Sequence, residues 1–143
     1  MNFLSRYLPR IDFDSYQDFK DNYRVIIPEN FNFGYDIVDE YARLEPSKPA
    51  LLWLNDDGDE AEFTFGDVKE YSDRIANLLT GLGIGKGDRV LLILKQRPEV
   101  WFTLVALCKM GATSIPASFQ LTEKDIIYRC DAANIKMIIA AED

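Results

Sequence analysis

The chain has 143 residues, and 48% of them are hydrophobic, which is typical of one globular domain and excludes a disordered segment. Its formal net charge of −8, with no cluster of basic residues, argues against binding to nucleic acid or to an anionic membrane. No apolar run is long enough to cross a bilayer, and the absence of histidine excludes His-based catalytic triads and the commonest metal ligand.

The first residues point to a cytoplasmic location. The segment MNFLSRYLPRIDFD lacks the continuous apolar core of a secretory signal, and its acids argue against a transit peptide. The two cysteines, Cys108 and Cys130, are far apart in the sequence and lie among apolar residues, so we expect buried, reduced thiols.

Two helices are expected at the start of the chain. Residues 14–27 predict a short amphipathic helix that ends before Pro28, and apolar spacing predicts a second helix from Asn32 or Phe33 to Leu44. We interpret residues 1–49 as an N-terminal helical segment and residues 50–143 as a second part of the chain.

A β-hairpin follows these helices. Residues 50–54 and 62–65 predict two strands, and Asp57-Gly58 between them is a favourable hairpin turn. The acids around this turn do not have the spacing of an EF-hand, so we expect a solvated turn and no metal site.

The clearest amphipathic helix begins after Thr64. Thr64 and Asp67 predict a capping box, and the helix carries a single apolar stripe. The stripe comprises Val68, Tyr71, Ile75, Leu78, Leu79 and Leu82. Four glycines at 81, 83, 85 and 87 follow a helix and precede a strand, the reverse of a phosphate-binding loop, so we expect only a helix stop and a tight turn.

A βαβ unit forms the centre of the sequence. Residues 90–94 are an apolar run of the kind found in a strand buried on both faces of a parallel sheet. Pro98 suits the first turn of the next helix, whose residues are apolar nearly all round, as in an interior helix. Gly111 can end this helix, and residues 112–117 predict the next strand.

The remaining residues extend this unit. Thr122 and Asp125 predict another capping box, Asn134 a left-handed cap, and residues 136–140 a third strand. The fold class is therefore α/β, a partial doubly wound parallel sheet (βαβαβ) preceded by two helices and a hairpin. Because the sequence stops directly after a buried-type strand, we expect it to be a fragment of a larger domain.

The aromatic residues Trp53, Trp101 and Phe102 could suggest a stacking platform for a base or an acyl group. Their strand and helix spacing is more typical of packing in the core, and we expect them there.

The ordered segments resemble the AMP-forming acyl-CoA synthetases of the acyl-adenylate-forming superfamily. The resemblance covers roughly residues 30–143 and most resembles the medium-chain branch, with acetyl-CoA synthetases close behind. It is carried by FNFGYDIVDEYA, PALLWLNDDG, FTFGDVKEYSDRIANLLTGLGIGKGDRVLLIL and RPEVWFTLVALCKMGATSIPASFQLTEKDIIYR.

The resemblance implies a ligase that uses ATP, Mg²⁺ and coenzyme A to activate a short- or medium-chain fatty acid. It also implies that the phosphate loop, the adenine-binding segment and the C-terminal lid lie outside these residues. We therefore expect no catalytic residue here, no cofactor bound by this chain alone, and no adenylation by it.

Three residues are candidate contacts. Gln120 matches a coenzyme A contact of the medium-chain branch, although an ordinary loop amide would look the same. Arg129 could pair with a coenzyme A phosphate, but a salt bridge to Asp125 is the favoured interpretation. Arg97 follows the first strand of the βαβ unit, at the end where open α/β sheets bind ligands, and is otherwise expected to face solvent.

Two alternatives remain open. The βαβαβ pattern alone permits a free-standing flavodoxin-like binding module, although the ends of the strands lack the carboxylates of a receiver module. A different adenylate-forming enzyme, such as an aryl-CoA ligase or a peptide-synthetase adenylation domain, would share these segments. For a fragment, the apolar surface left by the missing half of the domain favours self-association into a homo-oligomer.

Overall fold

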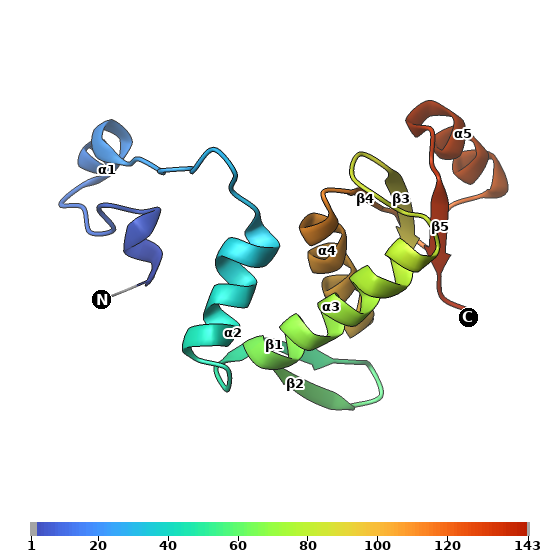
Figure 1. The fold of residues 1–143 in the computed structure, drawn as a ribbon, viewed down its shortest axis with the longest axis horizontal. Helices are drawn as coiled ribbons and strands as arrows, with labels where there is room; N and C mark the ends of the chain where they lie inside the picture. The colour runs from blue at the N-terminus through green and yellow to red at the C-terminus, as the bar shows by residue number, and fades with distance from the viewer. Residues whose placement is uncertain (1–2, 143) are drawn as a thin grey trace. The chain divides into compact units, whose positions relative to one another are not determined.

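The computed structural model describes residues 3–142. Its contacts divide the chain into two units, Met1–Phe31 and Asn32–Asp143. The two units are described separately below, and the second contains the predicted sheet (Figure 1).

The first unit has a short 3-10 helix, η1 (Phe3–Arg6), and one α-helix, α1 (Tyr16–Asn22). The hydroxyl of Ser15 caps α1 by accepting a hydrogen bond from the Asp18 amide at 3.1 Å. This helix is shorter than the predicted 14–27 helix. The run Val25-Ile26-Ile27 lies beyond it in irregular structure, because β-branched side chains lose rotamer freedom in a helix.

The second unit begins with a continuous helical segment made of η2 (Gly34–Asp39), which is π-helical, and α2 (Glu40–Leu44). The predicted hairpin follows, with β1 (Pro49–Leu54) antiparallel to β2 (Glu60–Thr64). Gly58 has φ +86°, which a glycine adopts without steric cost, and it forms the turn as predicted.

The main sheet has three parallel strands. Strand β3 (Arg89–Ile93) lies between β4 (Thr113–Pro116) and β5 (Met137–Ala140). Val90 and Leu91 are fully buried, which confirms that this segment is an inner strand. The predicted fold class, a partial doubly wound sheet, is also confirmed.

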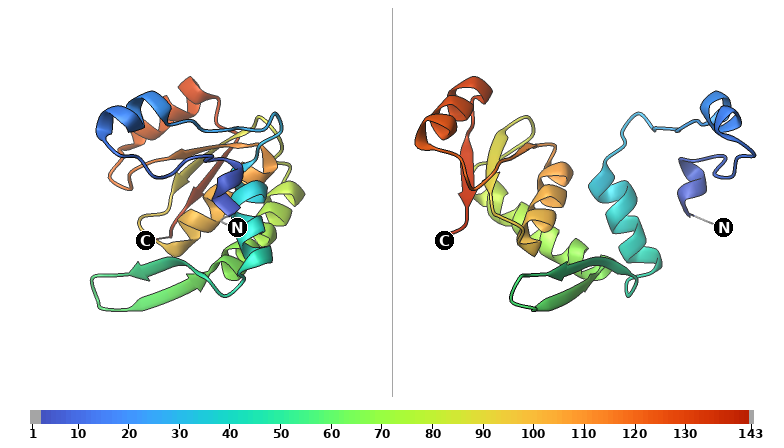
Figure 2. Two further views of the ribbon diagram at one scale, coloured as in Figure 1. Left: turned by 90° about the vertical axis from the view of Figure 1, so that its left-hand side faces the viewer. Right: turned by 180° about the vertical axis from the view of Figure 1, so that it is seen from behind.

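Helices cover the sheet from two sides. Helices α3 (Phe65–Gly81) and α4 (Pro98–Met110) lie on one side, and α5 (Glu123–Ala133) lies on the other (Figures 1 and 2). The chain crosses from β3 to β4 through α4 and then back past β3 to β5 through α5. Because right-handed crossovers in opposite directions place their helices on opposite faces of a sheet, α4 and α5 lie on different sides. The core on the α3–α4 side contains Leu79, Ile84, Val90, Leu92 and Leu107.

The predicted helix ends are confirmed. Thr64 and Asp67 form a reciprocal capping box on α3, and Thr122 and Asp125 form one on α5. Helix α4 ends at Gly111 and helix α5 ends at Asn134, and both residues have a left-handed backbone conformation.

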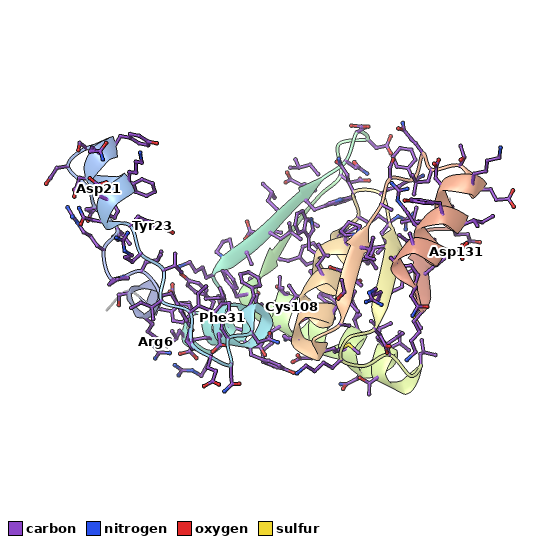
Figure 3. All side chains as sticks on the ribbon, turned by 90° about the horizontal axis from the view of Figure 1, so that it is seen from above. Arg6, Asp21, Tyr23, Phe31, Cys108 and Asp131 are labelled. Atoms are coloured by element: carbon purple, nitrogen blue, oxygen red, sulfur yellow. The ribbon has the colours of Figure 1, made fainter. Side chains whose placement is uncertain are left out.

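Three packing predictions were wrong. On α3 the serine Ser72 is fully buried, whereas Leu78 and Leu82 of the predicted stripe are 62% and 59% exposed. Helix α4 is not interior all round, since Trp101 is 54% exposed. Both cysteines are half-buried rather than buried, and Cys108 is shown on α4 in Figure 3. The small Ser72 shares the buried face of α3 with Val68 and Leu79, whereas Leu78 lies on the outer face.

Candidate functional site

The carboxyl ends of β3 and β4 meet at one edge of the sheet, because the two strands are parallel. Ligands bind at this edge in open α/β sheets. The loop after β3 (residues 94–97) carries Arg97, and the loop after β4 (residues 117–122) carries Gln120. The structure therefore brings two of the three predicted contacts to the same edge.

The loop after β3 is held by the hairpin. The indole nitrogen of Trp53 on β1 donates a hydrogen bond to the Gln96 carbonyl at 2.6 Å. Arg97 is exposed at the N-cap position of α4, as expected. A polar cavity of about 460 Å³ opens beside it. Its lining residues are Trp53, Asn55, Asp57, Arg97, Pro98 and Glu99.

The loop after β4 presents Gln120 to solvent. The backbone N–H of Gln120 donates a hydrogen bond to Ser118 Oγ at 3.1 Å, which closes a local turn. Within residues 3–142 the Gln120 side chain has no hydrogen-bond partner. Its carboxamide can therefore both donate to and accept from a ligand or water.

Arg129 lies on α5 and is half-buried. Hydrogen bonds from the Thr122 hydroxyl and backbone lower the pKa of Asp125, and the charge of Arg129 adds a smaller lowering effect. This charge effect is present, but the described residues show no salt bridge between Arg129 and Asp125, so the favoured interpretation of Arg129 is not confirmed. Its proposed contact with coenzyme A stays a prediction.

A buried lysine that the sequence analysis missed joins three helices. The Lys109 ammonium lies 2.6 Å from Asp39 on η2 and 2.6 Å from Asp73 on α3, and 1% of the lysine side chain is exposed. Burial of Asp73 opposes its ionisation, but hydrogen bonds from Lys109 and Lys69 outweigh this and hold its pKa below the usual value. The signal in the sequence was a lone lysine in an apolar helix; its partners are too distant in sequence for spacing to reveal them.

An apolar cavity of about 390 Å³ lies between η2, β1, α3 and α4. Trp101 lines it, together with Phe33, Leu51, Val68 and Leu104. The prediction that Trp101 is a core residue is wrong, whereas Phe102 beside it is 4% exposed and confirms that prediction.

The described part of the chain holds no group of three His, Cys, Asp or Glu side chains placed to bind a metal. In the same residues no helix is both long and apolar enough to cross a membrane. The edge offers the guanidinium of Arg97, the carboxamide of Gln120 and the indole of Trp53, and the carboxylates of Asp57 and Glu99 line the same cavity as Arg97.

Sequence comparison identifies one family. Residues 38–143 match the family described as AMP-binding enzyme. The chain is 41% identical over 122 residues to "Acyl-coenzyme A synthetase ACSM5, mitochondrial" of Rattus norvegicus, covering 81% of this chain and 21% of that protein. It is 37% identical over 134 residues to "Acyl-coenzyme A synthetase ACSM3, mitochondrial" of Homo sapiens, covering 90% and 23%. The chain thus spans about a fifth of the length of the curated relatives it matches.

Solved structures give the same result. The chain is similar to a "Mycobacterium tuberculosis fatty acyl CoA synthetase", with a TM-score of 0.69 and 25% identity over 76% of this chain and 21% of that one. It is also similar to the NpsA N-terminal subdomain of Klebsiella oxytoca in complex with anthranilyl-AMSN, with a TM-score of 0.67 and 27% identity over 75% and 27%.

Proposed function

Because the chain belongs to the AMP-binding enzyme family, we propose that it forms the N-terminal part of an acid–thiol ligase that joins a carboxylic acid to coenzyme A. The observation that carries this proposal is the 37–41% identity to acyl-coenzyme A synthetases over most of the chain. The likeness of the segment SFQLTEKDIIYR to the medium-chain branch supports a short- or medium-chain fatty acid as the substrate.

The reaction has two steps. A carboxylate oxygen attacks the α-phosphorus of Mg²⁺-bound ATP, and the bond to pyrophosphate breaks, which leaves an acyl-adenylate. The coenzyme A thiol then loses its proton and attacks the acyl carbon, and AMP leaves with the bonding electrons. Catalysis of such a transfer depends on positioning and on cations that neutralise developing charge.

The described residues contribute to the second step in this proposal. Gln120, exposed at the carboxyl edge, contacts the amide-rich arm or the adenine of coenzyme A. Arg97 at the same edge and Arg129 on α5 are candidate partners for its phosphates, which guanidinium groups bind well. The present 143 residues contain no Ser/Thr/Gly-rich phosphate loop after a strand, so we propose that they do not form an adenylate alone.

The test uses the full-length protein. ATP and a series of carboxylic acids from acetate to dodecanoate are supplied, and pyrophosphate release and acyl-CoA formation are measured separately. Gln120→Ala should raise the KM for coenzyme A about three- to tenfold, the loss of one hydrogen bond or two, without slowing pyrophosphate release. Gln17→Ala removes an exposed amide from α1 and is the control. Absence of pyrophosphate release with every acid would overturn the proposal and favour the flavodoxin-like module.

The second candidate is an aryl-acid adenylating enzyme. The likeness to the NpsA subdomain in complex with anthranilyl-AMSN supports it, at lower identity than the acyl-coenzyme A synthetases. Anthranilate and benzoate in the same series of acids decide between the two.

We also propose a cytoplasmic location for the protein, although the mammalian relatives are named as mitochondrial. Fractionation of cells that express the full-length protein tests this proposal.

A further inference from the structure

The loop that carries Gln120 is fixed firmly at its two ends. At its start the Ala117 amide donates to the Leu92 carbonyl at 2.9 Å, which continues the sheet ladder. At its end the Thr122 hydroxyl donates to Asp125 at 2.7 Å in the capping box of α5. Between these points the Leu121 amide donates to the Ser118 carbonyl at 3.4 Å and the Gln120 amide donates to Ser118 Oγ at 3.1 Å, so both bonds stay within the loop. A contact from outside the loop would therefore restrict the conformation of its centre.

Lys95 supplies a contact to that centre. Its ammonium lies 5.6 Å from the centroid of the Phe119 ring, within the range of a cation–π interaction. Phe119 is 58% exposed and directly precedes Gln120, so the ring has little other packing to fix it. The contact joins the loop after β3 to the loop after β4.

The backbone of Lys95 is itself unusual. Its φ of +52° lies in the left-handed region, which a non-glycine residue adopts only where its surroundings impose it. The preceding Leu94 is buried, and the Gln96 carbonyl accepts the hydrogen bond from Trp53. Lys95 therefore projects from a backbone that is held on both sides, and its ammonium reaches the exposed ring of Phe119.

We propose that Lys95 and Phe119 are positioning residues that hold Gln120 in the conformation that coenzyme A requires. The proposal rests on the proposed function, and it assigns the pair to the thioester-forming step alone. Neither residue touches a reacting atom; they act through the loop. Loss of the pair weakens coenzyme A binding because the loop must then be ordered by the ligand.

The experiment compares the two half-reactions in the full-length protein. Lys95→Met and Phe119→Leu should each raise the KM for coenzyme A about two- to fivefold, the worth of one exposed cation–π contact, with pyrophosphate release unchanged. The double variant should be no worse than either single variant, since both remove the same contact. Lys95→Arg keeps a cation over the ring and should restore the wild-type KM. Lys86→Met, at an exposed lysine before β3, is the matched control.

Amide hydrogen exchange gives a second readout. Residues 117–122 should exchange faster in Lys95→Met and Phe119→Leu than in the wild-type protein, without a change in α4. A KM for coenzyme A that neither variant moves, or an equal loss in both half-reactions, would overturn the positioning role while leaving the ligase in place. Absence of acyl-adenylate formation by the wild-type protein would overturn both proposals.

Discussion

The ammonium of Lys109 lies 2.6 Å from the Asp73 carboxylate, although only 1% of the lysine side chain is exposed. Asp39 lies at the same distance on the other side, so one buried cation joins α4 to α3 and to η2. Helices α3 and α4 cover one side of the sheet, so this junction ties together the helices that pack on β3.

Replacing Lys109 should destabilise the protein strongly. Lys109→Met leaves Asp39 and Asp73 without their shared cation, and we expect a loss on the order of 3 kcal/mol in the free energy of unfolding. Lys69→Met is the control, because Lys69 contacts the same Asp73 but is 44% exposed, and it should cost less than about 1 kcal/mol. Urea unfolding at pH 7 measures both. Equal effects of the two variants would show that burial of Lys109 has no energetic consequence.

The Asp73 carboxylate should make stability depend on pH. Its pKa in the folded protein is below the unperturbed value of 3.8, so its contribution is full above about pH 4 and is lost as the pH falls through the lowered folded pKa. The destabilisation caused by Asp73→Asn should therefore be largest at pH 7 and pH 5 and should shrink at pH 3. Unfolding of both proteins across this range gives the result. A difference that grows on acidification would contradict the assigned direction of the shift.

Gly34 is required for the close approach of η2 to α4. A Cβ atom at this position would lie 2.5 Å from Lys109 Cγ and 3.3 Å from the Val105 carbonyl oxygen. The lysine cannot move aside freely because both carboxylates hold its ammonium, so Gly34→Ala should cost about 1–3 kcal/mol. The matched substitution Gly81→Ala places a methyl group in open space at the end of α3 and should be neutral or slightly stabilising. Thermal unfolding of the two variants distinguishes a steric effect from a general glycine effect.

Local signals predicted the fold well. The capping box of Thr64 and Asp67, the first-turn position of Pro98 and the left-handed cap at Gly111 depend on neighbouring residues only, and each is found in the structure. The central position of β3 followed from its continuous apolar run, because only a strand covered on both faces excludes polar residues.

Long-range pairing could not be predicted in the same way. The apolar stripe of α3 did not show that the fully buried Ser72 would face the core while Leu78 remained exposed. Lys109 and Asp39 are 70 positions apart in the sequence, so no helical spacing connects them. For the candidate site, the sequence predicted that Arg97 and Gln120 follow parallel strands. It could not predict the Lys95–Phe119 contact between their loops, because the two residues are far apart in the sequence.

Apolar side chains on the outer surface should cause self-association of the 143-residue polypeptide. Leu78 of α3 and Leu82, the residue directly after this helix, are both more than half exposed, and contiguous apolar surface favours association. Light scattering should show dimers or larger oligomers, and the double substitution of Leu78 and Leu82 by lysine should shift them toward monomer. A wild-type polypeptide that stays monomeric at high concentration would contradict this expectation.

Carboxylate-dependent pyrophosphate release, measured for the full-length protein and for residues 1–143 under the same conditions, tests the central claim most directly. We predict release by the full-length protein with a short- or medium-chain fatty acid, and none by residues 1–143. Release by the 143 residues alone would contradict the assignment of the ATP-handling groups to the rest of the protein. Absence of release by the full-length protein with every acid would contradict the ligase itself.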